Sequence, residues 1–239
     1  MLSLPRKENI MDPQFLADTL LFRGIDPEDI RAMASCLGFR EADYPRGSAV
    51  YLTGDTDVDI GIVLSGAVQI ESNDLWGTKS ILGIVGPGGV FAESYACCPD
   101  EPMMVDAVAV KDSRVLFVNV RKVFHTCPTP CGRHTDVIRN LVTVSSRKNI
   151  RLSQRILDTS SKTIRGRLIS YLSREAHLQE SRELSIPFDR QQLADYLGVD
   201  RSALSKELGK MKRDGLLDCR KNRFTIRSAD LQLELPPDR

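Results

Sequence analysis

Four side chains that can hydrogen-bond to the edges of nucleic-acid bases share one face of a predicted helix that starts after Asp200: Arg201, Ser202, Ser205 and Lys206. Arginine and lysine can donate to the O6 and N7 atoms of guanine, and a serine hydroxyl can either donate or accept. Apolar residues recur at helical spacing on the opposite face, which is predicted to pack into a core. Polar donors on the first turns of such a helix are typical of base recognition in the DNA major groove.

A second predicted helix, which starts after Asp189, precedes this one and is joined to it by a short turn. Asp189 and Gln192, three residues apart, form the pattern of a capping box. Gly198 can adopt the positive φ angle of a tight turn, and Asp200 is a good N-cap for the helix that follows. Two helices joined in this way predict a helix-turn-helix. The alternative is a helical hairpin that packs without contacting DNA.

Residues 218–227 are predicted to form a β-hairpin wing with four basic side chains. Residues of the wing and of the two helices are expected to contact DNA phosphates: Arg190, Gln191, Lys210, Arg220 and Arg223. Phosphate contacts position a protein on the duplex but carry no sequence information. The helix-turn-helix and the wing together predict a winged DNA-binding domain over residues 159–239.

The charge distribution supports this assignment, although the whole chain carries a net charge of only +1. Residues 159–239 contain 16 Lys and Arg against 12 Asp and Glu, a net charge of +4, so the rest of the chain carries −3. Residues 201–227 hold nine basic and three acidic residues. A basic region on a mildly acidic body indicates a polyanion as partner. For the charge alone, a solvated helix face is the alternative.

The first half of the chain is predicted to be rich in β-strands. Residues 13–40 resemble short helices, with Asp26 as an N-cap. Nine of the 16 glycines then fall between residues 47 and 89, among short β-branched runs that continue to Val120. Strands of this length between Gly, Asp and Asn turns predict a β sandwich, barrel or jelly roll. We assign residues 13–130 to this domain.

One long helix, assigned to residues 131–158, is predicted to connect the two domains. A seam with alternating steps of three and four residues runs along it: Ile138, Val142, Ser145, Asn149, Leu152 and Ile156. Such a seam favours pairing with the same helix of a second copy. A second stripe of Val137, Leu141 and Val144 is expected to face the β-domain. The alternative is a helix that packs only within its own chain. The polar run that begins at Asp158 is predicted to be a hinge.

These segments together resemble the CRP/FNR family of bacterial transcription regulators over nearly the whole chain. The residues that carry the resemblance are Leu21–Ile25, Gly54-Asp55, Ile62–Val68, Gly89–Glu93 and Asp200–Leu208. It implies an α+β fold with an N-terminal β jelly-roll sensor domain, a long dimerisation helix and a C-terminal winged helix-turn-helix domain. It also implies a homodimer that binds a palindromic site in double-stranded DNA under the control of an effector. RNA polymerase is the further partner expected of an activator, although the sequence does not distinguish activation from repression.

The sequence departs from the family pattern where cyclic AMP would bind. Members that bind cyclic AMP carry Phe-Gly-Glu, followed ten residues after the glutamate by Arg-Ser. Here the corresponding residues are Phe91-Ala92-Glu93 and, ten residues on, Met103 and Met104. A buried phosphate without a cationic partner is costly, so we predict that cyclic AMP is not the effector. The predicted effector pocket is more apolar and is lined by Glu93, Ser94, Met103 and Met104; plain core packing of the methionines is the alternative.

The six cysteines leave the cofactor open. They are Cys36, Cys97, Cys98, Cys127, Cys131 and Cys219. FNR-type members bind an iron–sulfur cluster through a group of N-terminal cysteines, but residues 1–35 contain none. Cys127 and Cys131, between His125 and His134, are compatible with a metal or cluster site or a redox dithiol, which Cys36, Cys97 and Cys98 would complete. Buried inert thiols are the alternative. Cys219 is expected to be incidental.

Several classes of protein are excluded or disfavoured. With 41% hydrophobic and 27% charged residues, the composition is that of a soluble globular protein. We find no apolar run long enough to span a membrane and no secretory signal, so a cytoplasmic protein is expected. No catalytic triad, phosphate-binding loop or paired-carboxylate motif is visible, and three histidines outside the main strands disfavour a cupin-type metalloenzyme. A regulatory module that binds protein instead of DNA remains as a third class.

Overall fold

The computed structural model describes residues 12–73, 79–124 and 133–227. The chain divides into two compact units, one up to Arg147 and one from Lys148 onward. The division falls inside the long helix α5 (His134–Thr159), whose two halves therefore belong to different units. Cys127 and Cys131 lie outside the described residues. No helix in the described part of the chain is long and apolar enough to cross a membrane.

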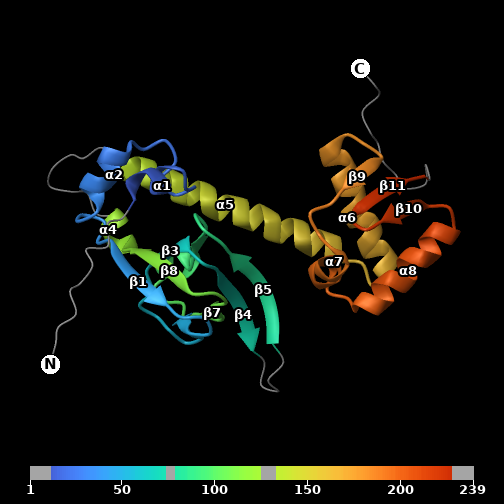
Figure 1. The fold of residues 1–239 in the computed structure, drawn as a ribbon, viewed down its shortest axis with the longest axis horizontal. Helices are drawn as coiled ribbons and strands as arrows, with labels where there is room; N and C mark the ends of the chain where they lie inside the picture. The colour runs from blue at the N-terminus through green and yellow to red at the C-terminus, as the bar shows by residue number, and fades with distance from the viewer. Residues whose placement is uncertain (1–11, 74–78, 125–132, 228–239) are drawn as a thin grey trace. The chain divides into compact units, whose positions relative to one another are not determined.

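Unit 1 contains two antiparallel four-stranded sheets (Figure 1). One has the order β1-β8-β3-β6 and the other β2-β7-β4-β5. Their bounds are β1 (Arg40–Tyr44), β2 (Ala49–Tyr51), β3 (Ile60–Ser65), β4 (Val68–Asn73), β5 (Lys79–Val85), β6 (Val90–Phe91), β7 (Asp106–Ala109) and β8 (Ser113–Val118). This arrangement confirms the predicted jelly roll. Strand β1 was missed by the sequence analysis, because its polar residues lack the β-branched character of a typical strand.

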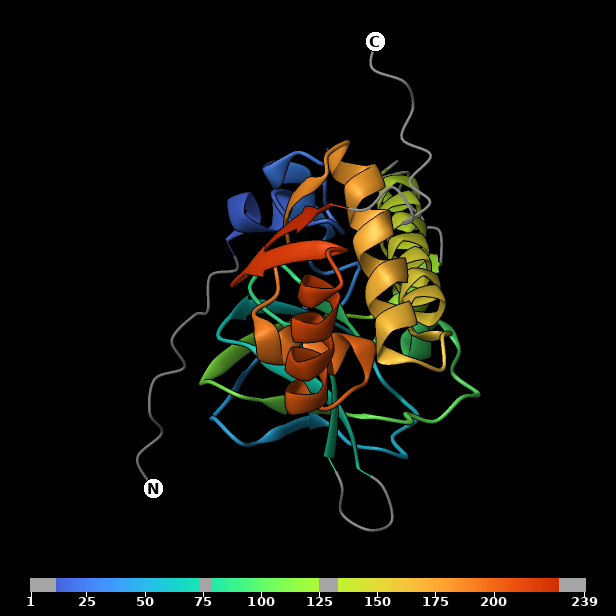
Figure 2. The same cartoon turned by 90° about the vertical axis from the view of Figure 1, so that its right-hand side faces the viewer.

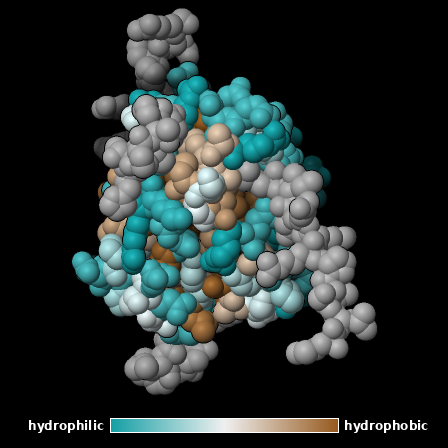
Figure 3. Space-filling model, turned by 90° about the vertical axis from the view of Figure 1, so that its left-hand side faces the viewer, coloured by the Kyte–Doolittle hydropathy of each residue, from teal (hydrophilic) through white to brown (hydrophobic). Residues whose placement is uncertain are grey.

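Short helices flank the sheets of unit 1: α1 (Pro13–Ala17), α2 (Pro27–Met33), α3 (Glu93–Cys97) and α4 (Val120–Phe124). Asp26 caps α2 as predicted, because its side chain accepts a hydrogen bond from the backbone N–H of Glu28. Figure 3 shows the side of the structure that lies on the left in Figure 1. On this side, a weakly hydrophobic area is bordered by hydrophilic side chains.

Strands β3 and β6 of one sheet approach closely at Gly61, which pairs with Phe91. The ring of Phe91 occupies the place that a Cβ atom at residue 61 would take, so only glycine fits there. The first half of α5 packs against unit 1 through Val137, Leu141 and Val144, which are buried in the main core cluster. This confirms the predicted second stripe.

Unit 2 combines three helices with a small sheet. The helices after α5 are α6 (Ile164–Gln179), α7 (Arg190–Leu197) and α8 (Arg201–Arg213). The strands are β9 (Glu183–Ser185), β10 (Leu217–Arg220) and β11 (Arg223–Ile226), in the order β10-β11-β9. In Figure 2 the orange helix α8 and the red strands of the wing face the viewer. The helix-turn-helix and the wing are therefore confirmed.

The capping and turn motifs predicted from the sequence are present in unit 2. Asp189 and Gln192 form a complete capping box at the start of α7. Gly198 follows α7 with a φ angle of +63°, which a residue with a side chain would rarely adopt. The core of the unit contains one apolar face from each of α7 and α8: Leu193, Ala194, Leu197, Leu204, Leu208 and Met211.

Candidate nucleic-acid interface and effector region

The outer face of α8 carries the four side chains predicted to read bases. Arg201, Ser202, Ser205 and Lys206 are all exposed. Asp200 caps the helix by accepting hydrogen bonds from the Ser202 hydroxyl and, at 2.9 Å, from the Ala203 backbone N–H. These two bonds lower the pKa of Asp200. Because the Ser202 hydroxyl donates to Asp200, it is left to act toward a base mainly as an acceptor.

An arginine from α6 neutralises two acidic residues, Glu207 of α8 and Asp214 directly after its end. Arg165 Nε donates to Glu207 at 2.6 Å and Arg165 Nη2 donates to Asp214 at 2.8 Å. The two hydrogen bonds raise the pKa of Arg165. Lys210 Nζ lies 3.7 Å from the second oxygen of Glu207. The ion pairs hold α8 against α6, and Glu207 is shared between Arg165 and Lys210, one of the predicted phosphate contacts.

The residues predicted to contact phosphates fall into two groups. Arg220 and Arg223 are exposed and lie opposite each other in the β10–β11 hairpin. Arg190 instead packs its guanidinium group over the ring of Phe224, at 5.5 Å, and donates to the Lys221 carbonyl at 3.3 Å. Arg190 therefore also has a structural role, since it ties α7 to the wing.

The two remaining phosphate candidates and one further lysine complete the basic surface. Gln191 is exposed and donates to Asp195, whereas the side chain of Lys210 is about half exposed. A hollow of about 310 Å³ beside the wing is lined by Lys212, Asp218, Arg220 and Arg223, and Lys212 Nζ pairs with Asp218 at 2.6 Å. Sequence reasoning missed Lys212, although its place in the last turn of a basic helix was a usable signal.

The end of α5 is anchored in unit 2 by a buried carboxylate. Asp158 is 1% exposed and accepts hydrogen bonds from Tyr196 Oη at 2.8 Å and from Arg174 Nη2 at 3.0 Å. Burial, followed by the hydrogen bond to Asp158, raises the pKa of Tyr196 to about 12, so its hydroxyl keeps the proton that it donates. The predicted hinge is wrong for its first residues, because Asp158 and Thr159 are helical and Asp158 is fixed to α6 and α7; the break between helices follows at residues 160–163.

Two arginines cap the C-terminal end of α7. Arg155 of α5 donates to the carbonyl oxygens of Tyr196 and Asp195, both at 3.1 Å. Arg167 of α6 donates to the carbonyl oxygens of Leu197 and Gly198, at 2.8 and 3.1 Å. Cations favour the negative end of a helix. The orientation of the helix-turn-helix is therefore fixed by side chains of α5 and α6, which sequence patterns alone did not indicate.

The residues predicted to line the effector pocket do not share one environment. Glu93 and Met103 are 3% and 2% exposed, and Met103 belongs to the main core cluster. Ser94 and Met104 are exposed, the latter by 72%. Backbone hydrogen bonds of 2.8 Å hold Met103 against Gly54 and Asp55. Met103 thus follows the core-packing alternative, and neither methionine supplies the cation that a cyclic phosphate needs.

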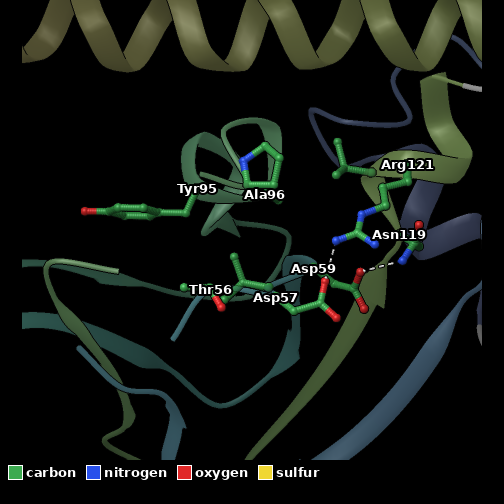
Figure 4. Close-up of a pocket in the computed structure, with 10 residues that line it drawn as sticks. Thr56, Asp57, Asp59, Tyr95, Ala96, Asn119 and Arg121 are labelled. Carbon is green, nitrogen blue, oxygen red and sulfur yellow. Dashed lines mark hydrogen bonds and ion pairs between the residues drawn. The ribbon is translucent and has the colours of Figure 1, made fainter. Parts of the chain in front are cut away.

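A narrow pocket in unit 1, drawn in Figure 4, is lined by other residues. Asp57 pairs with Arg121 at 2.8 Å and Asp59 accepts from Asn119 at 2.9 Å, so the polar groups satisfy one another. The enclosed volume of about 10 Å³ is the lower limit for a single water molecule. This pocket does not have the size of a small-molecule effector site.

The described cysteines do not assemble. In the described ranges no three His, Cys, Asp or Glu side chains gather in a way that would hold a metal ion, so Cys36, Cys97 and Cys98 do not form a ligand set there. Burial, then the neighbouring Cys98 and Glu93, raise the pKa of Cys97, which keeps it a thiol. Cys36 Sγ lies 3.4 Å from His134 Nε2, a pairing that sequence reasoning missed.

The predicted seam of α5 is exposed over most of its length. Val142, Leu152 and Ile156 are each about 60% exposed, and Asn149 is exposed as well. Ile138 and Ser145 are half-buried. The structure adds Ile150 and Leu157, which are also exposed and which sequence reasoning missed because they lie beside the seam. The exposed apolar seam residues thus fall into two groups, Val142 in unit 1 and Ile150, Leu152, Ile156 and Leu157 in unit 2, with the polar Ser145 and Asn149 between them.

Comparisons with known proteins match both units. A family profile described as a cyclic nucleotide-binding domain matches residues 41–127, and one described as a Crp-like helix-turn-helix domain matches residues 166–232. A CRP-like cAMP-activated global transcriptional regulator of Mycobacterium tuberculosis is 24% identical over 207 residues, covering 84% of this chain and 89% of the relative. The cyclic AMP receptor protein of Thermus thermophilus is 31% identical over 96 residues, or 40% of this chain and 43% of the relative.

Among solved structures, CprK complexed with OCPA is 17% identical to this chain. The similarity has a TM-score of 0.62 and covers 85% of this chain and 92% of that chain. At this level of identity the similarity shows a shared fold, and it agrees with the order of jelly roll, long helix and helix-turn-helix described above.

Proposed function

The chain belongs to the CRP/FNR family of transcription regulators, and on this premise we propose that it is a homodimer that binds a palindromic operator in double-stranded DNA. The observation that carries the proposal is the exposed face of α8, where Arg201, Ser202, Ser205 and Lys206 lie on the first turns of the helix. The neutralisation of Glu207 and Asp214 by Arg165 supports it, because acidic groups beside a phosphate backbone would repel it. The family consists of transcription regulators, and no catalytic role is proposed.

The test is selection of bound fragments from a genomic DNA library, followed by mobility-shift titration of the selected operator at several salt concentrations. The affinity is expected to fall steeply as salt rises, because cationic side chains displace counterions from the phosphates. The variant Arg201→Ala/Lys206→Ala should lose operator binding. Arg46→Ala, an exposed arginine of unit 1, removes a matched charge and should bind normally. Absence of salt-sensitive binding to any fragment would favour the protein-binding alternative.

The homodimer is proposed from the exposed seam of α5. The residues of the proposed interface are Ile138, Val142, Ser145, Asn149, Leu152 and Ile156. A seam of this kind is typical of a helix that pairs with a second copy. In sedimentation equilibrium the chain should be a dimer and Leu152→Glu a monomer. Leu178→Glu, a change at an equally exposed leucine of α6, is the control. A monomeric wild-type chain contradicts the proposal.

We also propose that the effector is not cyclic AMP, that the protein acts in the cytoplasm and that RNA polymerase is a further partner. The methionines at residues 103 and 104 support the first point, because neither can neutralise a phosphate. Isothermal titration with cyclic AMP should give no binding heat, and the operator affinity should not change when the nucleotide is added. Binding of cyclic AMP at micromolar concentration would overturn this part of the proposal.

A further inference from the structure

The last two turns of α5 present two different surfaces, both within unit 2. Leu152 and Ile156, members of the proposed dimer seam, are each 59% exposed. Arg155 is half-buried and Asp158 is buried, and both bind α7. Because a helix makes one turn in about 3.6 residues, these two pairs of side chains lie on different faces. The end of α5 can therefore contact a second copy and the helix-turn-helix at the same time.

Arg155 and Asp158 hold the last turn of α7, which lies beside the end of α5 in Figure 1. Arg155 Nε donates to the carbonyl oxygen of Tyr196 at 3.1 Å, and Arg155 Nη2 donates to that of Asp195 at the same distance. The Arg155 guanidinium lies 5.7 Å from the centre of the Tyr196 ring, within the range of a cation–π contact. The Tyr196 hydroxyl donates to Asp158 at 2.8 Å. We call Arg155, Asp158 and Tyr196 the α5–α7 clamp.

The α5–α7 clamp lies close to the start of α8 along the chain. Only residues 198–200 separate the end of α7 at Leu197 from the start of α8 at Arg201. Both helices contribute buried side chains to the same core of unit 2. Because close packing makes such a pair of helices rigid, a contact that fixes α7 on α5 also fixes α8 on α5.

We propose that the α5–α7 clamp sets the spacing of the two DNA half-sites that the dimer accepts, with Arg155 as the positioning residue. The inference rests on the proposed function, and it concerns a residue that belongs neither to the proposed base contacts nor to the seam. Helix-turn-helix dimers bind half-sites about one helical turn, about 34–36 Å, apart, because the protein fixes the distance between its two DNA-binding helices. In a dimer paired through Leu152 and Ile156, that distance is fixed only as far as each α8 is fixed to its own α5.

A purely structural role of Arg155 predicts a different result. Cations at the C-terminal end of a helix stabilise that helix, so an Arg155 that only caps α7 would affect binding to every DNA equally. A positioning role instead changes how the affinity depends on half-site spacing, because a loosely held α8 reaches several spacings with similar affinity. The spacing dependence is therefore the property to measure.

The experiment compares the full wild-type chain with Arg155→Met and with Arg151→Met, a matched control at an exposed arginine one turn earlier on α5. Methionine keeps an unbranched side chain and a high helix propensity but removes the hydrogen-bond donors. Mobility-shift titrations use the selected operator, operators with one base pair added or removed between the half-sites, and a fragment with a single half-site. One base pair turns a half-site by about 34–36° around the duplex axis, so the wild type should lose more than about tenfold in affinity.

Arg155→Met should lose less than about threefold in affinity when the spacing changes, and its affinity for the single half-site should stay within about twofold of the wild type. Arg151→Met should keep the spacing dependence of the wild type. Circular dichroism of each variant checks that it is folded. If Arg155→Met does not fold, Arg155→Lys is measured in its place with the same expectation, because lysine keeps the charge but lacks the planar fork that reaches two carbonyl oxygens.

The proposal is overturned if the folded Arg155 variant keeps the wild-type dependence on spacing, or if its affinity falls by the same factor on every operator and on the single half-site. Either result leaves the proposed function intact, since the wild type still binds its operator. A wild type that binds all spacings equally also overturns the proposed role of the clamp. A wild type that binds no DNA overturns the proposed function, and this inference with it.

Discussion

Helix α8 and the region around Glu93 differ in how well the sequence indicated which side chains share one surface. On α8 the four residues singled out from the sequence share one exposed face. Around Glu93 the four residues divide, because Glu93 and Met103 are buried while Ser94 and Met104 are exposed. A helix repeats every 3.6 residues, so spacing determines which side chains share a face. The Met103–Met104 segment between α3 and β7 has no such period, so only packing decides where its side chains point.

Both units bury charged side chains beside their apolar cores, Glu71 and Glu93 in unit 1 and Asp158 in unit 2. The core clusters of unit 1 are formed by apolar side chains, including those between its two sheets. In unit 2 a similar apolar core is joined by the buried network of Asp158, Arg174 and Tyr196, which ties the end of α5 to the helix-turn-helix. Removing one partner of a buried ion pair strongly lowers the free energy of unfolding, because the other group is left buried without compensation. Substitutions can therefore test each unit separately.

The largest effect is expected at Asp158. Asp158→Ala leaves the Arg174 guanidinium and the Tyr196 hydroxyl without their acceptor, and should lower the free energy of unfolding of unit 2 by about 3–5 kcal/mol. Tyr196→Phe removes one hydrogen bond to a charged group and should cost about 1.5–3 kcal/mol. Urea titrations followed by far-ultraviolet circular dichroism measure both, since unit 2 is rich in helix. Equal stability of Asp158→Ala and wild type would show that the network does not hold α5.

In unit 1, substitutions of Met103 and Met104 test whether these methionines pack in the core or line a pocket. Met103→Ala should cost about 2–5 kcal/mol because it leaves a cavity in the core. Met104→Ala, at an exposed position, should change stability by less than about 0.5 kcal/mol. The same urea titration measures these variants. Near-wild-type stability of Met103→Ala would mean that the methionine lines a cavity, and would restore the predicted effector pocket.

A smaller effect should distinguish two arginines of the DNA-binding unit. Arg223→Ala removes one exposed cation, so operator affinity should fall on all sequences alike and the salt slope should decrease by about 1. Arg190→Ala should in addition lower the thermal stability of unit 2, because Arg190 packs over Phe224. Salt-dependent mobility shifts and thermal melts measure the two properties. Equal melting temperatures for both variants would argue against the structural role of Arg190.

The smallest effect concerns the N-cap of α8. The hydrogen bonds from Ser202 and Ala203 lower the pKa of Asp200 below its ordinary value of 3.8. A carboxylate with a depressed pKa contributes stability above that ordinary value and loses it as the pH falls through the lower value of the folded state. When the pH falls below this lowered pKa, the Ala203 N–H should lose protection. Its hydrogen-exchange rate should then rise relative to the intrinsic rate at the same pH. Asp200→Asn should abolish this pH dependence while keeping a side chain that can cap the helix.

Much of the fold followed from local signals in the sequence. The capping box at Asp189 and the αL turn at Gly198 are local, so each depends on only a few neighbouring residues. Strand β1 was missed because it is polar and is stabilised by pairing with β8, more than 60 residues away. The contact of Cys36 with His134 and the anchoring of Asp158 were missed for the same reason, since both join residues from separate elements.

The sequence by itself determined the class of the protein and the face of α8 that is proposed to meet DNA. Helical period, capping residues and charge act over a few residues, and they can be read without coordinates. Only the tertiary structure decided that Met103 belongs to the core, that Arg190 supports the wing and that Asp158 holds α5 to the helix-turn-helix. Each of these roles depends on which distant side chain fills the adjacent space, and close packing sets that partner for the chain as a whole.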